Sequence, residues 1–282
     1  MQRNTTDAFY VRLIYYYTFL RGRRIPELLN LRNPKTWNEK INYLKIHIDR
    51  LIPDAHVYAD KLRVRDYVAD VISGDHLVPL LGAWNDPAEI DWAGLPDSFV
   101  LKANHGSGFN LIVRDHGSLD IASATERMNA WLETDYSSMA GEKHYRRIPR
   151  RLLAEELVVS TGGDLPDYRC YCFDGAVGFI SINVDRATDH RRLYVDRDWN
   201  PMPFEIDKPR PDWELERPAV LNQVVSIAES LAAPFFFVRV DLFEAKGSVI
   251  FSELTFIPAG GMHFVSPRRW NRKLGALIRL PE

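Results

Sequence analysis

The sequence predicts a mixed α+β fold in which antiparallel hairpins alternate with helices. Two pairs of strand-like runs flank short turns, Asp174-Gly175 in the first pair and Lys246-Gly247 in the second. An Asp-Gly turn between two such runs is a strong signal for a β-hairpin. Helical spacing of apolar residues recurs elsewhere, for example over residues 121–135 and 218–232. Hairpins mixed with helices are typical of the α+β class.

The N-terminal part is expected to be helical. Apolar residues have helical spacing over residues 5–30, 37–47 and 57–72. Thr36 is a plausible N-cap of the second helix, and Gly74 can end the third. These helices define a helical region over residues 1–75, and residues 76–282 follow as the main domain.

The main domain is expected to open with strands. Residues 78–84 form a short extended run, and Pro79 favours an edge position because proline cannot donate to the sheet. Residues 98–102 form a strand that leads into a glycine loop. The remaining expected elements are a strand over 152–159, a turn over 160–164, hairpins over 167–183 and 238–254, a loop over 199–217 and a helix over 267–280.

Composition excludes several classes of protein. The 282 residues carry a formal net charge of −2, which gives no reason to expect a nucleic acid partner. The chain has no apolar stretch of about 20 residues, so no membrane span is expected. Its two cysteines, Cys170 and Cys172, are expected on one face of a strand, a poor geometry for a disulfide. We therefore expect a cytoplasmic protein with reduced thiols.

The aromatic run from Phe9 to Leu20 allows two interpretations. It is amphipathic and is followed by Arg21, Arg23 and Arg24. A helix packed on the body of the protein is one interpretation. The other is an interfacial helix in peripheral contact with the inner leaflet of a membrane.

Lys102 and the loop His105-Gly106-Ser107-Gly108 form the first candidate site. A lysine at the end of a strand can place its charge on phosphate oxygens, and a glycine loop lets backbone N–H groups approach them. The order of residues differs from a P-loop. An ordinary turn after a strand is the alternative.

Asp241 and Glu253 form the second candidate site. Counting back from the turn near residues 245–247 places the two carboxylates close together across a hairpin. Mg²⁺ prefers one or two carboxylates together with waters and substrate phosphates. Arg239 lies two residues before Asp241 and so shares its face. A surface ion pair is the alternative.

Two further segments are weaker candidates. Arg169 shares a strand face with two aromatic residues and is a candidate for binding phosphate, although a salt bridge to Asp167 or Asp185 explains it equally well. Glu155 and Glu156 stand within an apolar strand that is a candidate for binding adenine through its backbone, or is simply a core strand.

In their order along the chain, these segments resemble the ATP-grasp superfamily. The similarity is greatest to its teichuronopeptide-biosynthesis (TupA-like) branch and covers about residues 30–280. The segments that carry it are Trp37-Asn38-Glu39-Lys40-Ile41, Asp60-Lys61-Leu62-Arg63-Val64-Arg65, residues 99–108, Leu165-Pro166-Asp167-Tyr168-Arg169 and residues 251–256.

The resemblance implies a fold and a set of binding residues. Two α+β lobes, about residues 76–160 and 161–282, would clasp ATP, next to the short helical N-terminal region. Arg169 and Arg239 would stabilise the transferring phosphoryl group. The residues implied in binding ATP are Lys61, Lys102, His105, Gly106, Ser107, Gly108, Glu155, Glu156 and Leu157. The residues implied in binding Mg²⁺ are Asp241, Glu253 and Thr255. Many members have asparagine where this chain has Thr255, so one metal ion is as plausible as two.

The implied activity is that of an ATP-dependent carboxylate–amine ligase that acts through an acyl-phosphate in surface-polysaccharide or glycopeptide biosynthesis. The acceptor would be a small molecule or a glycan precursor. A metal-dependent glycosyltransferase using the triplet Asp196-Arg197-Asp198, a sugar kinase and a non-enzymatic ATP-binding protein are the alternatives. Candidate residues for binding an anionic acceptor are Arg186, His190, Arg191, Arg192 and His263, unless these residues belong to a solvated loop.

Overall fold

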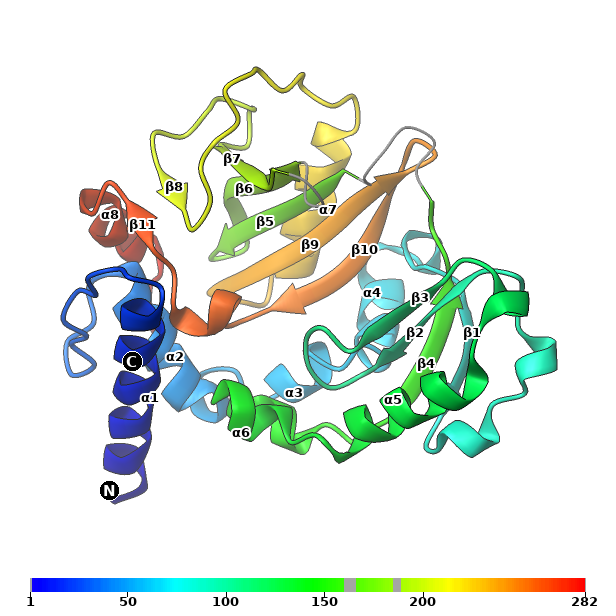
Figure 1. Cartoon of the computed structure of the whole chain (residues 1–282). Helices are drawn as coiled ribbons and strands as arrows, with labels where there is room; N and C mark the ends of the chain where they lie inside the picture. Colours follow the sequence, from blue (N-terminus) through cyan, green and yellow to red (C-terminus); the bar gives the residue numbers. More distant parts are fainter. Residues whose placement is uncertain (1, 160–165, 185–188, 282) are drawn as a thin grey trace.

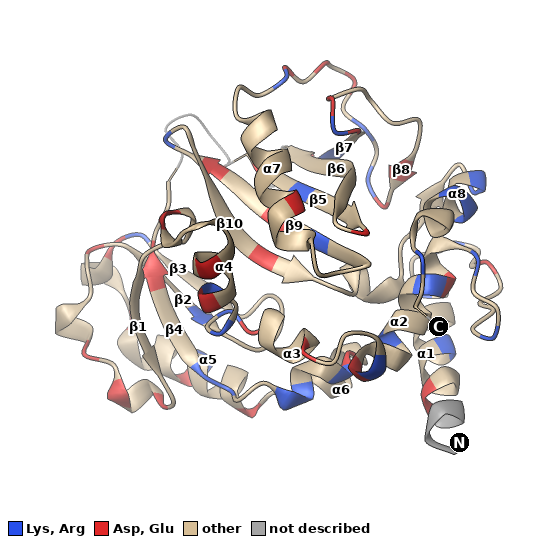
Figure 2. Ribbon diagram, turned by 180° about the vertical axis from the view of Figure 1, so that it is seen from behind, with Lys and Arg blue, Asp and Glu red and all other residues tan. Residues whose placement is uncertain are grey.

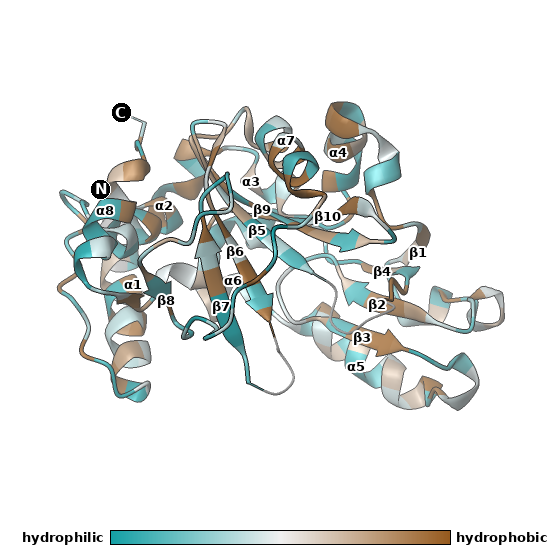
Figure 3. Cartoon of the chain, turned by 90° about the horizontal axis from the view of Figure 1, so that it is seen from above, coloured by the Kyte–Doolittle hydropathy of each residue, from teal (hydrophilic) through white to brown (hydrophobic). Residues whose placement is uncertain are grey.

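A computed structural model of the protein describes residues 2–159, 166–184 and 189–281. Two antiparallel sheets lie next to each other, and helices α1, α2 and α8 lie at the end remote from the four-stranded sheet (Figures 1 and 3). The α+β class predicted from the hairpins and helices is confirmed.

The smaller sheet has four strands in the order β1-β4-β2-β3. All neighbouring strands are antiparallel. Helix α5 supplies Met128 and Trp131 to the core of this sheet. The elements are β1 (Leu80–Trp84), β2 (Phe99–Ala103), β3 (Asn110–Val113), α5 (Ile121–Glu133) and β4 (Leu152–Glu156). β1 is an edge strand, as Pro79 predicted.

The larger sheet has five strands in the order β10-β9-β5-β6-β7. Helix α7 packs on one face, where Cys170 and Cys172 are buried as free thiols. The elements are β5 (Asp167–Phe173), β6 (Ala176–Val184), β7 (Arg191–Val195), α7 (Leu221–Ala232), β9 (Phe237–Ala245) and β10 (Ser248–Thr255). The other face carries the polar residues described below.

Both predicted hairpins are present. Asp174 and Gly175 have φ values of 48° and 81°, and Lys246 and Gly247 have 52° and 76°. Two successive residues with positive φ make the turn whose twist matches that of the strands it joins. The turns therefore fix which strands pair in the larger sheet.

The N-terminal helices are shorter than the sequence suggested. The predicted helix 5–30 ends at Arg21 as α1 (Gln2–Arg21), because Gly22 and Arg23 form a turn and Pro26 cannot continue a helix. α2 (Trp37–Leu51) begins at the predicted cap, where Thr36 and Glu39 form a capping box.

The predicted helix 57–72 is two helices, α3 (Ala55–Tyr58) and α4 (Val64–Ile72). The Asp60 carboxylate causes the break because it accepts hydrogen bonds from the backbone N–H groups of Leu62 and Arg63 and from the Asn104 amide. Ser73 rather than Gly74 occupies the last position of α4, with a φ of 91°.

The remaining short elements connect the sheets and close the chain. They are α6 (Tyr136–Ala140), β8 (Glu205–Ile206), β11 (Val265–Ser266), α8 (Arg269–Leu277) and the 3₁₀ helices η1 (Gly74–His76), η2 (Pro87–Glu89), η3 (Trp92–Gly94), η4 (His116–Ser118), η5 (Lys143–Arg147) and η6 (Pro258–Gly261).

One face of α1 packs on the body, as the first interpretation of the aromatic run predicted. Val11, Tyr15 and Phe19 are buried there. In the part of the chain that the structure describes, no helix has the length and apolar character needed to cross a bilayer.

Close packing of α8 against the start of α2 gives a test of the fold. A Cβ atom at Gly275 would lie 2.4 Å from the Lys35 carbonyl oxygen and 2.7 Å from the Trp37 nitrogen. Since these are backbone atoms, Gly275→Ala should destabilise the protein by about 1–3 kcal/mol, more than alanine gains in helix propensity. Thermal unfolding measures the effect.

Gly74→Ala is the matched control, because no heavy atom lies within 4 Å of its added Cβ. Its melting temperature should stay near that of the unchanged protein. A Gly275→Ala variant that melts no lower than this control contradicts the packing described here.

Candidate functional site

Two rows of side chains cross the larger sheet on the face opposite α7. Arg169 of β5 pairs with Asp241 of β9, which pairs with Glu253 of β10. In the next row, Arg239 lies between Tyr171 and Thr255. Residues that are paired directly across a ladder point to the same face. The two rows therefore gather basic and acidic groups on one surface, and acidic segments of β9 and β10 are visible in Figure 2.

A β-bulge at Ser252 brings Glu253 opposite Asp241. Between the hairpin turn and Phe251, which pairs with Leu242, the register is regular, and it then shifts by one residue. A regular ladder would place Ser252 opposite Asp241 and turn Glu253 toward the core. Bulges re-aim side chains in this way. The predicted proximity of the two carboxylates is confirmed, and the bulge is its cause.

Arg239 connects the acidic groups. Its Nε and Nη2 atoms each donate to Asp241 at 2.6 Å, and Nη2 also donates to Glu253 Oε1 at 3.2 Å and to Thr255 Oγ1 at 3.1 Å. Arg239 and Asp241 are both buried. The proposed surface ion pair is therefore wrong for this hairpin, since the pair lies inside the protein.

The two carboxylates differ in their electrostatic surroundings. Burial raises the pKa of Asp241 despite the attraction of Arg239, and the nearby Glu253 charge adds to the rise. Burial also acts on Glu253, but Arg239, Lys61 and Arg169 outweigh it and lower the pKa of that carboxyl. Glu253 is the more exposed of the two, with 38% of its side chain accessible against 5% for Asp241. Glu253 is therefore the better placed to bind a ligand in its ionised form.

Arg169 contacts both of its acidic neighbours. Its Nε atom lies 3.1 Å from Asp167 Oδ2 and 3.8 Å from Asp241 Oδ2. The predicted salt bridge to Asp167 is present, whereas Asp185 lies outside the described residues. Arg169 nevertheless keeps a side chain that is 26% exposed and faces a cavity.

The smaller sheet and α4 supply the opposing cations. Lys102 Nζ lies 2.5 Å from Glu155 Oε2, and Arg65 Nη1 lies 2.8 Å from Glu155 Oε1. The Lys61 ammonium donates to the Gly106 carbonyl oxygen at 2.5 Å, and burial lowers its pKa although Glu253 opposes the change. Glu155 thus neutralises part of the positive charge on this wall.

The glycine loop leaves β2 with Gly106 at a φ of 120°. A Cβ atom there would lie 2.8 Å from the Tyr136 ring, so only glycine fits. Ser107 and Gly108 line the cavity. His105 is buried away from it, and its Nε2 contacts the Trp131 carbonyl oxygen at 3.1 Å.

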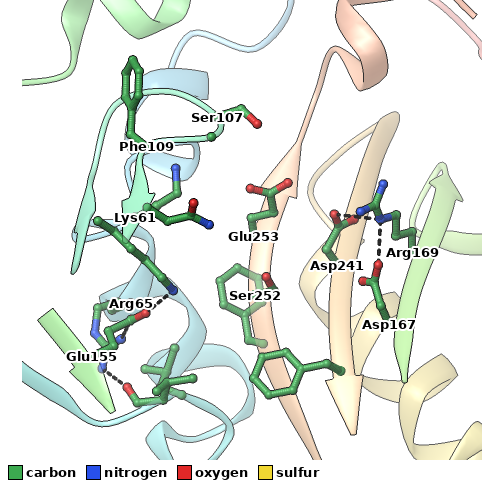
Figure 4. A pocket seen from close by; sticks show the side chains of 17 residues that line it. Lys61, Arg65, Ser107, Phe109, Glu155, Asp167, Arg169, Asp241, Ser252 and Glu253 are labelled. Carbon is green, nitrogen blue, oxygen red and sulfur yellow. Dashed lines mark hydrogen bonds and ion pairs between the residues drawn. The ribbon is translucent and has the colours of Figure 1, made fainter. Parts of the chain in front are cut away.

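These groups surround a first cavity of about 250 Å³. Figure 4 shows Glu253 between Lys61 and Ser107 on one side and Asp241, Arg169 and Asp167 on the other. Four cationic side chains, Lys61, Arg65, Lys102 and Arg169, line it together with four acidic ones, Glu155, Asp167, Asp241 and Glu253.

A second cavity of about 430 Å³ adjoins the first. Ser107, Arg169 and Glu253 line both cavities, so these residues mark the boundary between them. Arg192 and Thr255 line the second cavity. His263 does so as well, and it is buried: Trp37 Nε1 donates to its Nδ1 at 2.8 Å, and burial lowers its pKa to about 4.

Several residues singled out in the sequence do not line either cavity. The side chain of Glu156 is exposed, and its N–H donates to the Pro79 carbonyl oxygen at 3.1 Å. β4 ends before Leu157. Arg191 pairs with Asp189, and His190 contacts Asn183. Arg186 lies outside the described residues, as do residues 160–165.

The triplet Asp196-Arg197-Asp198 shapes a turn. Asp196 accepts hydrogen bonds from the N–H groups of Asp198 and Asn200 at 2.9 and 2.8 Å. Its three residues line neither of the two adjoining cavities. Sugar-diphosphate binding by this triplet would therefore take place away from the charged site.

Sequence reasoning did not assign roles to other residues that line the cavities. Arg65 lies within the quoted segment 60–65, which was the only signal for it. Glu142 and Asp207 line the second cavity, together with Tyr136 and Tyr145. They come from separate loops and short helices, so no spacing in the sequence connects them.

The donor set suits Mg²⁺ bound jointly with a ligand. Two carboxylates share one face, and Glu253 Oε2 makes no hydrogen bond within the described part of the chain. Mg²⁺ needs only one or two carboxylates when phosphates and waters complete its shell. No group of three or more His, Cys, Asp or Glu residues suited to a metal occurs in the ranges that the structure describes. Thr255 is engaged with Arg239 and Glu253, which favours a single metal ion.

Solved structures with a related arrangement are ligases by their names. One is a D-alanine–D-alanine ligase from Bacillus anthracis complexed with ATP, with 16% identity, a TM-score of 0.44 and coverage of 72% of this chain and 56% of that one. Another is D-alanyl-alanine synthetase A from Vibrio cholerae, with 15% identity, a TM-score of 0.43 and coverage of 79% and 61%. The ATP-grasp ligase PsnB, complexed with a minimal precursor, Mg and ADP, has 17% identity, a TM-score of 0.38 and coverage of 73% and 52%.

The chain therefore spans between 52% and 61% of the length of these structures. No curated protein matches the sequence. A family model described as TupA-like ATPgrasp matches residues 39–279, which include both sheets and both cavities. The chain belongs to the TupA-like ATP-grasp family.

Proposed function

We propose that the protein is an ATP-dependent carboxylate–amine ligase that binds Mg-ATP in the first cavity and its acceptor in the second. The observation that carries the proposal is the shared boundary of Ser107, Arg169 and Glu253 between the two cavities. A phosphoryl group at this boundary would be next to an acceptor carboxylate. Family membership supports the choice of ATP as nucleotide.

Charge balance in the first cavity favours Mg-ATP over free ATP. Its four cationic and four acidic lining residues leave little net positive charge for a free triphosphate. Asp241 and Glu253 would hold Mg²⁺, which reduces the charge on the phosphate oxygens. Lys61 and Lys102 would contact the phosphates, and Ser107 and Gly108 would cover them.

In the proposed reaction, an acceptor carboxylate oxygen attacks the γ-phosphorus, and ADP leaves with the electrons of the broken P–O bond. Arg169 and Arg239 stand where negative charge develops during this transfer. An amine then attacks the carbonyl carbon of the acyl-phosphate, and phosphate leaves. The second cavity keeps both acceptors on one side of the boundary.

Arg192 supports an anionic acceptor. It lines the second cavity, and its Nε donates to Asn183 at 2.9 Å. No carboxylate within 4.0 Å pairs with it in the described ranges. We propose that it binds the anionic group of a glycan precursor such as a uronic acid, which places the enzyme in surface-polysaccharide or glycopeptide biosynthesis. A sugar kinase at the same site is the second candidate.

Product analysis tests the proposed function. The protein is incubated with Mg-ATP, UDP-glucuronic acid and amino acids, and the products are followed by mass spectrometry. We expect ADP, phosphate and an adduct lighter than its two parts by one water. A stable phosphorylated sugar that forms without amine supports the kinase, and UDP release without ADP supports the glycosyltransferase.

Glu253→Gln tests the metal site. The substitution keeps the shape of the side chain but removes the negative charge, so kcat for ADP formation should fall by about 100-fold or more. The matched control is Glu126→Gln, an exposed residue of α5, which should keep full activity. A Glu253→Gln enzyme with more than half of the original rate contradicts the assignment.

We also propose that α1 contacts an anionic membrane at the cytoplasmic leaflet. Phe9, Leu13, Tyr17 and Leu20 form an outward face with exposures of 69, 57, 62 and 66%. Exposed Arg21 and Arg23 follow directly. An apolar helix face beside basic residues suits the interface of a membrane that contains acidic lipids.

Co-sedimentation with vesicles tests this contact. The protein should bind phosphatidylglycerol vesicles, bind phosphatidylcholine vesicles more weakly, and lose binding as salt increases. Replacing Phe9, Leu13 and Leu20 by serine should weaken binding about tenfold or more. The control is Ile121→Ser, an exposed apolar residue on α5. Equal sedimentation of the triple variant and this control contradicts the proposal.

A further inference from the structure

The second cavity holds an acidic side chain that neither the nucleotide nor an anionic acceptor requires. Glu142 stands between α6 and η5, is 7% exposed and lines this cavity. Residues from three other elements influence it electrostatically: Lys45 of α2, Arg239 of β9 and Glu253 of β10. It therefore faces the same space as the catalytic row.

The Glu142 carboxylate has no partner in the folded chain. Its side chain makes no hydrogen bond and no ion pair within the described ranges, although the residue caps η5. Lys45, the nearest cation by its electrostatic effect, donates instead to the Gly260 carbonyl oxygen at 3.1 Å. Buried carboxylates are almost always hydrogen-bonded, because losing water without compensation costs free energy. A donor from outside the chain would satisfy this one.

We propose that Glu142 binds the nitrogen of the amine substrate in the second cavity and accepts its proton. This inference rests on the proposed ligase function. Arg192 and Glu142 line the same cavity with opposite charges, so an amine and an anionic group can be bound together. The substrate class is thus a primary amine held next to the acyl-phosphate.

The step balances without a further reactant. The amine nitrogen forms a bond to the acyl carbon, and the bond from that carbon to the phosphate oxygen breaks. Phosphate leaves with the electron pair, and the proton lost by nitrogen moves to a Glu142 oxygen. Burial raises the pKa of Glu142 to about 7, opposed by Lys45, so the group can both accept and release a proton near neutral pH.

Neighbouring tyrosines support this location and do not compete for the proton. Burial and the charges of Glu142 and Glu253 raise the pKa of Tyr136 to about 12 and that of Tyr145 well above its usual value. Both hydroxyls stay protonated near neutral pH. In the described lining of the second cavity, the carboxylates other than Glu142 are Asp207, whose Oδ1 accepts from Arg24, and Glu253, which Arg239 contacts.

A comparison of two nucleophiles tests the inference. Glu142→Gln enzyme is incubated with Mg-ATP and UDP-glucuronic acid, and either hydroxylamine or the amino acid that the unchanged enzyme converts fastest. Hydroxylamine is largely unprotonated at neutral pH and needs little help from a base. We expect hydroxamate formation within about threefold of the unchanged enzyme and amide formation reduced by about 100-fold. The amide deficit should shrink as pH rises and more of the amine is already deprotonated.

Other outcomes overturn the inference. An equal loss with both nucleophiles indicates a structural role, and amide formation within threefold of the unchanged enzyme removes any role. Glu133→Gln, an exposed residue of α5, is the matched control and should behave like the unchanged enzyme. If the unchanged enzyme forms neither hydroxamate nor amide, the proposed ligase function itself fails, and this inference fails with it.

Discussion

The hydrogen bonds of Arg239 are the interaction on which the rest of the site depends. A buried guanidinium and buried carboxylates are each costly alone, but together they satisfy one another. Arg239 makes two bonds to Asp241 and one each to Glu253 and Thr255, so three side chains on two strands take fixed positions. Truncating Arg239 would leave Asp241 buried without its principal donor. The arginine is thus a structural requirement before it is a catalytic one.

Each sheet supplies one half of the charge pattern. The larger sheet presents Asp241, Glu253 and the arginines, and the smaller sheet presents Lys102 beside Glu155. Lys61 connects the halves, because it precedes α4 in the chain, donates to the glycine loop and is influenced by Glu253. Since acidic and basic groups alternate around the first cavity, it suits a nucleotide accompanied by a divalent cation better than a bare polyanion.

The second cavity has a different chemical character from the first. It combines Arg192, the unpartnered Glu142 and several tyrosines, and residues from α6, η5, β5, β7, β9, β10 and η6 line it. Such a mixture suits a substrate with both anionic and amine groups. Its boundary with the first cavity is built from the same side chains that would contact a phosphoryl group, so the two substrates would meet there.

The sequence by itself determined the hairpins, the paired carboxylates and the glycine loop, because each depends on residues close together in the chain. Asp174-Gly175 and Lys246-Gly247 adopt positive φ whatever surrounds them. Only the tertiary structure decided the rest. The bulge at Ser252 sets which face Glu253 takes, and Asp60 breaks a helix by bonding to Asn104, a residue distant in sequence. Glu142 joins the site for the same reason: its neighbours come from separate elements, and their proximity is a product of packing between sheets that no local spacing encodes.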